Sequence, residues 1–296
     1  MIGITALSTI SHLPTFKADN IWNVLRIITP DDTLIIPDYK AYIPAASLRR
    51  YSPIIRNSVA AAMEVYQQGG QKNYDAISVG TGLGCLVDTE KFLQQVINTQ
   101  GGALSPTSFI QSTHNTVGGT ISMMLGNHAY NMTHTQQFLS FEWAMIDALL
   151  KMKEGASHVL VGGTDEYIPL LEKLHPEIIK GEEPLTSTTS FMELSHDSGV
   201  QIKDLTIGYG EIEVEINAFL SRNNVTESAI DLVIFGNQPR LSAPATSFLP
   251  YAGINQCNVA IGYHMAHDAI KYRGMKNVLV INDQTSKGVG LGLLSA

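Results

Sequence analysis

The stretch NMTHTQQFLSFEWAMIDALL, residues 131–150, decides how the rest of the sequence is interpreted. A threonine-rich approach leads through two neutral amides, Gln136 and Gln137, into a segment whose apolar side chains surround the helix axis. A helix that is apolar on nearly every side is expected to be buried on all sides. We therefore predict a central helix over residues 138–155, with the two glutamines at its N-terminus.

Short β-branched runs, bounded by glycine or polar residues, alternate with helical segments along the chain. The expected strands are IGITAL (2–7), DAISVGTG (75–82), SHVLVGGTDE (157–166), DLVIFGN (231–237), NVLVIND (277–283) and VGLGLL (289–294). The expected helices cover residues 47–69, 89–100, 138–155 and 259–274. This alternation indicates an α/β protein with covered sheets.

The order of elements occurs twice. Residues 74–80 resemble residues 230–236, and an Asp-Ala pair near the end of a helix precedes a strand at both 147–161 and 268–280. Such repetition indicates internal duplication. We expect a single domain over residues 1–296, with halves at about 1–170 and 171–296. In a duplicated α/β protein, a buried helix lies between two sheets, which predicts an αβαβα layering.

Composition excludes several classes of protein. The net charge of −8 leaves no basic patch to neutralise nucleic-acid phosphates. Two cysteines are too few for a disulfide framework and suit a reducing compartment. The first residues, MIGITALSTISHLP, do not resemble a signal peptide, and no apolar run approaches the ~18 residues of a membrane span. We expect a soluble, cytoplasmic protein.

Four motifs in order resemble the thiolase superfamily, and specifically the β-ketoacyl synthases. They are SLRRYSPIIRNSVAAAMEVY (47–66), DAISVGTGLG (75–84), SPTSFIQSTHNTVGGTISMMLGNHAYNMT (105–133) and VLVGGTDE (159–166). The resemblance implies a thiolase-like αβαβα fold, truncated relative to full ketosynthases mainly in its second half. It also implies a dimer formed through the strand that enters the central helix, here about residues 126–135, with an apolar partner surface.

The same resemblance identifies the positions of the catalytic groups. Family members carry Thr-Ala-Cys just before the central helix, and the spacing to Gly162 puts the cysteine at Gln137. Their first histidine falls at Gly236 or Asn237, and their second near Ile254. We interpret Gln137, Gly236 and Ile254 as degenerate active-site positions without intact catalytic residues. The candidates for lining the pocket are Gln136, Phe138, His114, Asn237, Asn255 and Cys257.

Loss of the thiol and of both imidazoles implies a partner subunit of the chain-length-factor type. Such a subunit pairs with an active ketosynthase and shapes acyl-chain elongation in polyketide or fatty-acid-type biosynthesis. The chain is most similar to those of aryl-polyene and flexirubin-like pathways. The implied partners are the active ketosynthase, or a second copy of the chain, and acyl carrier protein thioesters. No cofactor, nucleic acid or membrane is implied.

Two other functions are possible. An active acyltransferase or decarboxylase could use displaced groups, with Cys257 at the pseudo-symmetric helix start as the best alternative nucleophile. A buried, small apolar role for Cys257 is the simpler interpretation. The third possibility is a homodimeric protein that binds an acyl or aryl group without reaction.

Further patterns have structural interpretations. His264, His267 and Asp268 share one helical turn and could ligate a metal, but polar core residues are commoner there, so we expect no metal site. The run GTGLG (80–84) lacks the context of a dinucleotide site. Asp165 and Glu166 are expected at a solvated strand end.

Overall fold

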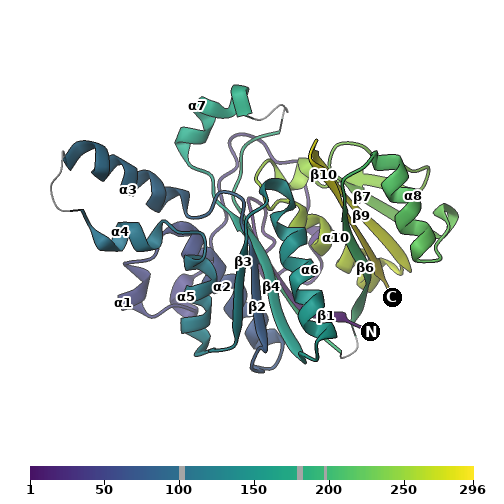
Figure 1. Ribbon diagram of the computed structural model, residues 1–296, viewed down its shortest axis with the longest axis horizontal. Helices are drawn as coiled ribbons and strands as arrows, with labels where there is room; N and C mark the ends of the chain where they lie inside the picture. The colour runs from purple at the N-terminus through teal and green to yellow at the C-terminus, as the bar shows by residue number, and fades with distance from the viewer. Residues whose placement is uncertain (100–103, 179–182, 197–198) are drawn as a thin grey trace.

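The computed structural model of the chain describes residues 1–99, 104–178, 183–196 and 199–296. Its strands form one mixed sheet in the order β3-β2-β4-β5-β1-β6-β10-β9-β7-β8 (Figure 1). The strands are β1 (Gly3–Ile10), β2 (Ala76–Gly80), β3 (Tyr130–His134), β4 (His158–Asp165), β5 (Thr188–Ser195), β6 (Val200–Gly208), β7 (Leu232–Phe235), β8 (Ala245–Ser247), β9 (Asn277–Thr285) and β10 (Gly288–Ser295).

The sheet consists of two five-stranded halves with the same internal order. From the outer edge inward, the order is β3-β2-β4-β5-β1 in the first half and β8-β7-β9-β10-β6 in the second. The two halves join where Ile4 of β1 pairs with Val200 of β6. Strand β5 pairs antiparallel with both β4 and β1, so it belongs to the first half. We therefore place the division between the halves after Ser195, not near residue 170.

Helices α6 (Ser140–Lys153) and α10 (Val259–Arg273) form the middle layer. Helix α6 packs on β2 and β4 and also contacts β6, while α10 packs on β9 and also contacts β1 and β5. The rings of Phe141 and Tyr263 join the two helices, with centroids 5.1 Å apart. Helices α2 and α5 cover the outer face of the first half, and α8 covers that of the second. The predicted αβαβα layering is confirmed.

The remaining helices lie on the outside of this sandwich. In Figure 1, α3 and α4 project to one side of the first half, and α7 projects above the sheet. The helices other than α6 and α10 are α1 (Ala45–Leu48), α2 (Pro53–Gln68), α3 (Leu86–Thr99), α4 (Pro106–Gln111), α5 (Thr116–Leu125), α7 (Pro169–Ile178), α8 (Ile212–Arg222) and α9 (Leu249–Ala252).

All six predicted strands and the helices predicted over 89–100, 138–155 and 259–274 are present with shifted ends, although residue 100 lies outside the described residues. The helix predicted over 47–69 is interrupted at residues 49–52, between α1 and α2. The sequence interpretation missed β3, β5, β6 and β8. Strands β3 and β8 are short, and β6 mixes polar and apolar side chains without a continuous apolar run. Strand β5 is entirely buried despite its Thr, Ser and Glu residues.

The prediction that the helix after Gln137 is buried on all sides is wrong. Leu150 on α6 is 50% exposed, and Trp143, Ile146 and Leu149 are only partly buried. Helix α10, in contrast, is buried without interruption over Val259–Ile270. One apolar face of α6 therefore remains accessible.

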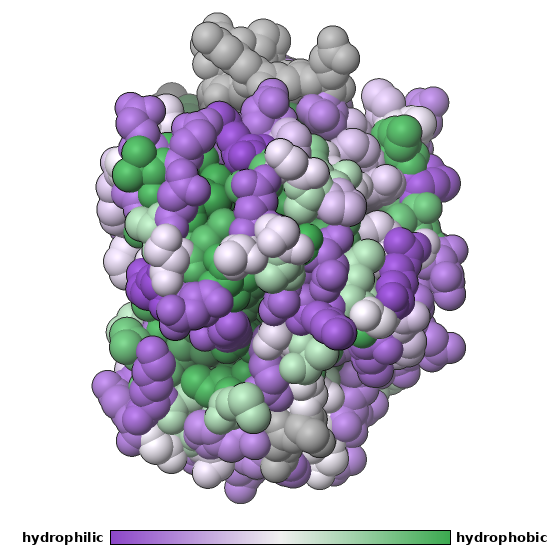
Figure 2. Space-filling view, turned by 90° about the vertical axis from the view of Figure 1, so that its right-hand side faces the viewer, coloured by the Kyte–Doolittle hydropathy of each residue, from purple (hydrophilic) through white to green (hydrophobic). Residues whose placement is uncertain are grey.

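On the face formed by the second half, hydrophobic side chains are exposed at the bottom of surface hollows. Figure 2 shows this face with green, hydrophobic residues on the floor of hollows that purple, hydrophilic side chains surround. Within the described ranges, no helix combines the length and the apolar character that crossing a membrane would require.

Candidate functional site at the start of helix α6

Gln137 occupies a left-handed backbone conformation directly before α6. Its φ is +52°, and it opens the short 3-10 helix η3 (Gln137–Leu139) between β3 and α6. The Ser140 hydroxyl fixes this turn, since it accepts from the Gln136 backbone N–H at 2.8 Å and donates to the Gln137 carbonyl at 2.7 Å. A non-glycine residue with positive φ is strained, and such strain is concentrated at functional sites.

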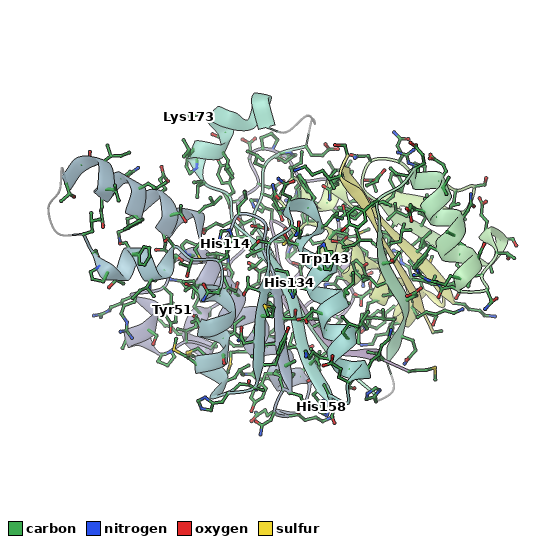
Figure 3. The ribbon with its side chains drawn as sticks, in the orientation of Figure 1. Tyr51, His114, His134, Trp143, His158 and Lys173 are labelled. Atoms are coloured by element: carbon green, nitrogen blue, oxygen red, sulfur yellow. The ribbon has the colours of Figure 1, made fainter. Side chains whose placement is uncertain are left out.

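A cavity of about 260 Å³ lies in front of this turn. Its lining residues are Thr135, Gln136, Gln137, Leu139, Trp143, Tyr209, Thr285 and Lys287. Lys287 is the only charged side chain among them, and its Nζ donates to Gln137 Oε1 at 3.3 Å. Trp143 lies in the first turns of α6 (Figure 3). The cavity offers an ammonium, amides and aromatic rings, but no thiol or imidazole among these lining residues.

A network of side-chain amides lies behind the turn. Asn282 Nδ2 donates to the Phe138 carbonyl at 2.6 Å and to Glu142 Oε1 at 2.7 Å. Gln284 Nε2 donates to Asn282 Oδ1 at 3.0 Å and to Asn258 Oδ1 at 2.7 Å. The strand β9 thereby joins the start of α6 to the start of α10. Buried hydrogen-bond networks of this kind rigidify the elements that they connect.

Glu142 is the carboxylic acid at the end of this network. It has no exposed surface, and burial raises its pKa to about 8 although Asn282 donates to it. Glu142 is therefore protonated at neutral pH. Among the described residues, the side-chain hydrogen bond of Glu142 is to the Asn282 amide and not to a second titratable group.

The comparisons with known proteins agree with this architecture. Residues 30–196, more than half of the chain, match the model of the β-ketoacyl synthase N-terminal domain. The chain belongs to the β-ketoacyl synthase family. No match was found among curated proteins.

Solved structures of ketosynthases share the fold over the full length. A chain of the ishigamide ketosynthase/chain length factor is 14% identical, with a TM-score of 0.81 and coverage of 99% of both chains. A chain of the ketosynthase ApeO in complex with its chain length factor ApeC, from Xenorhabdus doucetiae, is 11% identical, with a TM-score of 0.78 and coverage of 100% and 98%. A β-ketoacyl synthase from Burkholderia phymatum STM815 is 11% identical, with a TM-score of 0.77 and coverage of 99% and 98%.

The position predicted for the first ketosynthase histidine, Gly236 or Asn237, lies in a turn that is hydrogen bonded to Asp283 of β9. The Asn237 backbone N–H donates to Asp283 Oδ1 at 2.6 Å, and its Nδ2 donates to the Asp283 carbonyl at 2.7 Å. A Cβ at Gly236 would lie 2.8 Å from Asp283 Oδ1, so a side chain there would displace the carboxylate that holds the turn. The Asn237 side chain is committed to this turn and does not line the cavity at Gln137.

The position predicted for the second histidine, near Ile254, lies in a buried segment of the chain. Ile254 pairs through its backbone with residues 184–186, since its N–H donates to the Pro184 carbonyl at 2.9 Å. Asn255 Nδ2 donates to the hydroxyls of Thr186 and Thr188 at 3.0 and 2.9 Å. Both residues are buried, and neither lines the cavity at Gln137.

Cys257 lies in the core and not in the cavity. It has no exposed surface, and its Sγ donates to the Gly80 carbonyl at 3.4 Å. Burial, followed by the charge of Asp165, raises the pKa of this thiol well above its ordinary value. A thiol held protonated in this way is a poor nucleophile. Burial likewise raises the pKa of Cys85, which is also fully buried.

The other predicted positions are distributed as follows. Gln136 lines the cavity together with Gln137, while the backbone carbonyl of Phe138 serves the amide network. His114 is exposed and lies against Gly84, outside this cavity. His267 pairs with Asp268 at 2.8 Å. No group of three or more His, Cys, Asp or Glu residues is arranged for a metal ion in the described part of the chain.

The expectation of a solvated strand end at Asp165 and Glu166 is wrong, because both are buried. Asp165 accepts from the backbone N–H groups of Gly82 and Leu83 at 2.9 and 2.8 Å. The glycine turn at 80–84 thus gives these two amides to a carboxylate of its own chain, and neither remains for a dinucleotide phosphate.

Sequence reasoning missed the residues of the second half that hold the start of α6. Lys287, Asn282 and Gln284 all come from the segment NDQTSKGVG (282–290), in which Lys287 contacts Gln137 and the other two belong to the amide network behind the turn. The signal available in the sequence was the presence of three amide or ammonium side chains within six residues, which is unusual for a buried strand and the turn after it. Their meeting with Gln137 depends on the pairing of the two halves, which a single sequence does not display.

Proposed function

We propose that this chain is a non-catalytic ketosynthase-like subunit. It pairs with an active β-ketoacyl synthase in the cytoplasm and shapes acyl-chain elongation on carrier-protein thioesters. The observation that carries the proposal is the turn before α6. The Ser140 hydroxyl stabilises this turn, yet the exposed side chain at the predicted nucleophile position is the amide of Gln137. A carboxamide cannot form the thioester that condensation requires.

The alternative nucleophile does not favour an active enzyme. Cys257 is sealed from the cavity by the core, and its protonated state opposes attack on a thioester. The solved neighbours that pair a ketosynthase with a chain length factor support the partner interpretation over a solitary enzyme.

The partner surface that we propose is the free edge of the sheet at β3. Strand β3 pairs only with β2 in the described sheet, so its outer edge is open for another chain. Apolar side chains are exposed on β3 and on the helices at this end of the sheet. We call these residues the β3 edge patch: Met132 (41% exposed), Met123 (71%), Phe109 (56%) and Ile110 (62%).

The anchoring of β3 gives this edge a fixed position. Asp147 on α6 accepts from the hydroxyls of Tyr130 and Ser78 at 2.9 and 2.8 Å, and His134 Nε2 lies 3.2 Å from the same carboxylate. The short edge strand is therefore held to the central helix at both of its ends. A preformed edge of this kind suits pairing with a similar chain.

The test is affinity purification of the tagged chain from its native host, followed by mass spectrometry. We expect an active ketosynthase in one-to-one ratio. Met132→Asp should reduce recovery at least about tenfold, since a charge would replace a buried apolar contact. Val214→Asp, on the exposed surface of α8, is the matched control and should not change recovery. Recovery of a second copy alone would contradict the proposal and favour a homodimeric binding protein.

A further inference from the structure

A large cavity lies at the opposite end of α6 from Gln137. It measures about 880 Å³, within the range of small-molecule sites. Its floor is apolar and includes Ile146, Leu149 and Leu150 from the open face of α6, together with Ile202 and Leu205 from β6. The floor can therefore accept a hydrocarbon chain.

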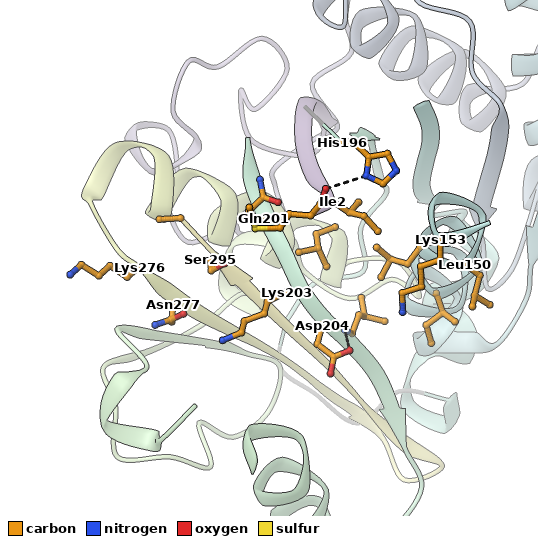
Figure 4. A pocket seen from close by; sticks show the side chains of 16 residues that line it. Ile2, Leu150, Lys153, His196, Gln201, Lys203, Asp204, Lys276, Asn277 and Ser295 are labelled. Atoms are coloured by element: carbon orange, nitrogen blue, oxygen red, sulfur yellow. Dashed lines mark hydrogen bonds between the residues drawn. The ribbon is translucent and has the colours of Figure 1, made fainter. Parts of the chain in front are cut away.

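The rim of this cavity is basic, although the protein as a whole is acidic. Lys153 on α6, Lys203 on β6 and Lys276 before β9 all line it. Figure 4 shows Lys203 and Lys153 on opposite sides of the apolar side chains. Three of the chain's 19 basic residues thus gather at one cavity in a protein of net charge −8.

The acidic side chain on this rim is already neutralised. Asp204 accepts from Arg222 Nε and Nη2 at 2.8 and 2.6 Å, and from Asn223 Nδ2 at 2.8 Å. Among the described residues, none of the three lysines forms an ion pair with a carboxylate. The charges of Lys153 and Lys203 remain available to a ligand, whereas that of Lys276 acts on the nearby Asp231 carboxylate.

We propose that this cavity binds a single-chain anionic amphiphile. The hydrocarbon chain lies on the apolar floor between α6 and β6, and the carboxylate or phosphate head lies against Lys153 and Lys203. The site is separate from the cavity at Gln137, which shares no lining residue with it. The inference does not depend on the proposed pairing with a ketosynthase.

The test is calorimetric titration of the full chain with octanoate, decanoate and dodecanoate below their micellar concentrations. Affinity should rise about fourfold for each added methylene, as hydrophobic burial predicts. Decyl phosphate distinguishes a phosphate-headed ligand from a free fatty acid. Decanol and decyltrimethylammonium should bind at least about tenfold more weakly than decanoate, because neither carries a negative charge for the lysines. Equal binding of the cationic amphiphile would overturn the proposal.

Substitutions in the lining residues test whether decanoate binds in this cavity. Leu150→Glu places a negative charge on the floor at a half-exposed helix position, so the chain should fold and decanoate binding should fall at least about tenfold. Lys153→Gln with Lys203→Gln should weaken decanoate several-fold and leave decanol unchanged. Lys40→Gln, exposed on the segment Tyr39–Ala41, is the control.

A decanoate analogue with a photoreactive chain should cross-link to peptides within residues 146–153 or 201–205. Cross-links confined to residues 135–143, or unchanged affinity in both cavity variants, would contradict the assignment.

Discussion

Helices α6 and α10 hold equivalent places in the two halves, but their surroundings differ. Helix α10 carries two histidines and an aspartate and is nevertheless buried over Val259–Ile270. Helix α6 is more apolar and exposes one face, including Leu150. Burial in this fold is thus determined by what the opposite half places against a helix and not by the composition of the helix alone.

The starts of the two helices differ in the same way. Gln137 is exposed at a cavity, whereas Cys257 and Asn258, at the start of α10, have no exposed surface. The start of α6 is accessible but carries no thiol, whereas the start of α10 carries a thiol that is buried in the core. This division of access and chemistry underlies the interpretation of the chain as a partner subunit.

The largest effect should appear in thiol reactivity. In Gln137→Cys, the introduced thiol should react with iodoacetamide about a thousandfold faster than Cys257, because a fully buried thiol reacts only when the structure opens. Peptide mapping by mass spectrometry over time measures both rates. Comparable labelling of Cys257 in the unmodified chain would show that the α10 start is accessible.

A second effect concerns the pH dependence of stability. The folded pKa of Glu142, about 8, lies above its unfolded value, so the folded state keeps a proton that the unfolded chain releases. The free energy of unfolding should therefore fall as pH rises from about 4.5 to 8, by up to about 1.4 kcal/mol per pH unit from this group. Glu142→Gln should remove this component. Urea unfolding at several pH values measures it.

The exposed carboxylate Glu154 supplies the control for that experiment, because its side chain is 65% exposed. Glu154→Gln should keep the pH dependence of the parent chain. If Glu142→Gln also keeps it, the carboxyl group behind Gln137 is not buried as described.

The amide network should have a smaller effect on stability. Asn282→Ala removes the amide that donates to the Phe138 carbonyl and to Glu142, and it deprives the buried Glu142 Oε1 of this donor. We expect a loss of about 3 kcal/mol in the free energy of unfolding. Asn23→Ala, at an exposed position, should change stability by less than about 0.5 kcal/mol. Similar losses for the two variants would show that β9 does not tie the helix starts together.

The smallest effect tests the left-handed turn. At Gln137, glycine should give a chain about 1 kcal/mol more stable than alanine, because alanine is strained at positive φ. At Ser221, an exposed position within α8, the order should reverse by a similar amount. Thermal unfolding of the four variants measures both differences. If the alanine variant is more stable than the glycine variant at both positions, the backbone of the turn before α6 is not left-handed.

The sequence predicted the layering, the six most apolar strands and the equivalence of the helices at 138–155 and 259–274. These features depend on local periodicity and on repetition within the chain. It did not predict that β5 belongs to the first half, because TTSFMELS carries hydroxyl and carboxyl groups at buried positions. Thr9 and Thr164 satisfy two of these hydroxyls, and such partners are brought together only by the sheet.

The site was predicted in part. Motif spacing located Gln137 at an exposed turn before the central helix, whereas Asn255 and Cys257 were expected near a pocket and lie in the core. The spacing identifies positions along the chain but not the depth at which they are buried. Lys287 reaches Gln137 across 150 residues, and no local pattern encodes that contact.

The most direct test of the account is intact-mass analysis of the isolated chain after incubation with acyl and malonyl thioesters, with released carbon dioxide measured in the same samples. We predict an unchanged mass and no carbon dioxide. A covalent acyl adduct on this chain, together with carbon dioxide release by it alone, would contradict the proposal that its turn before α6 does not support the chemistry of a condensing enzyme.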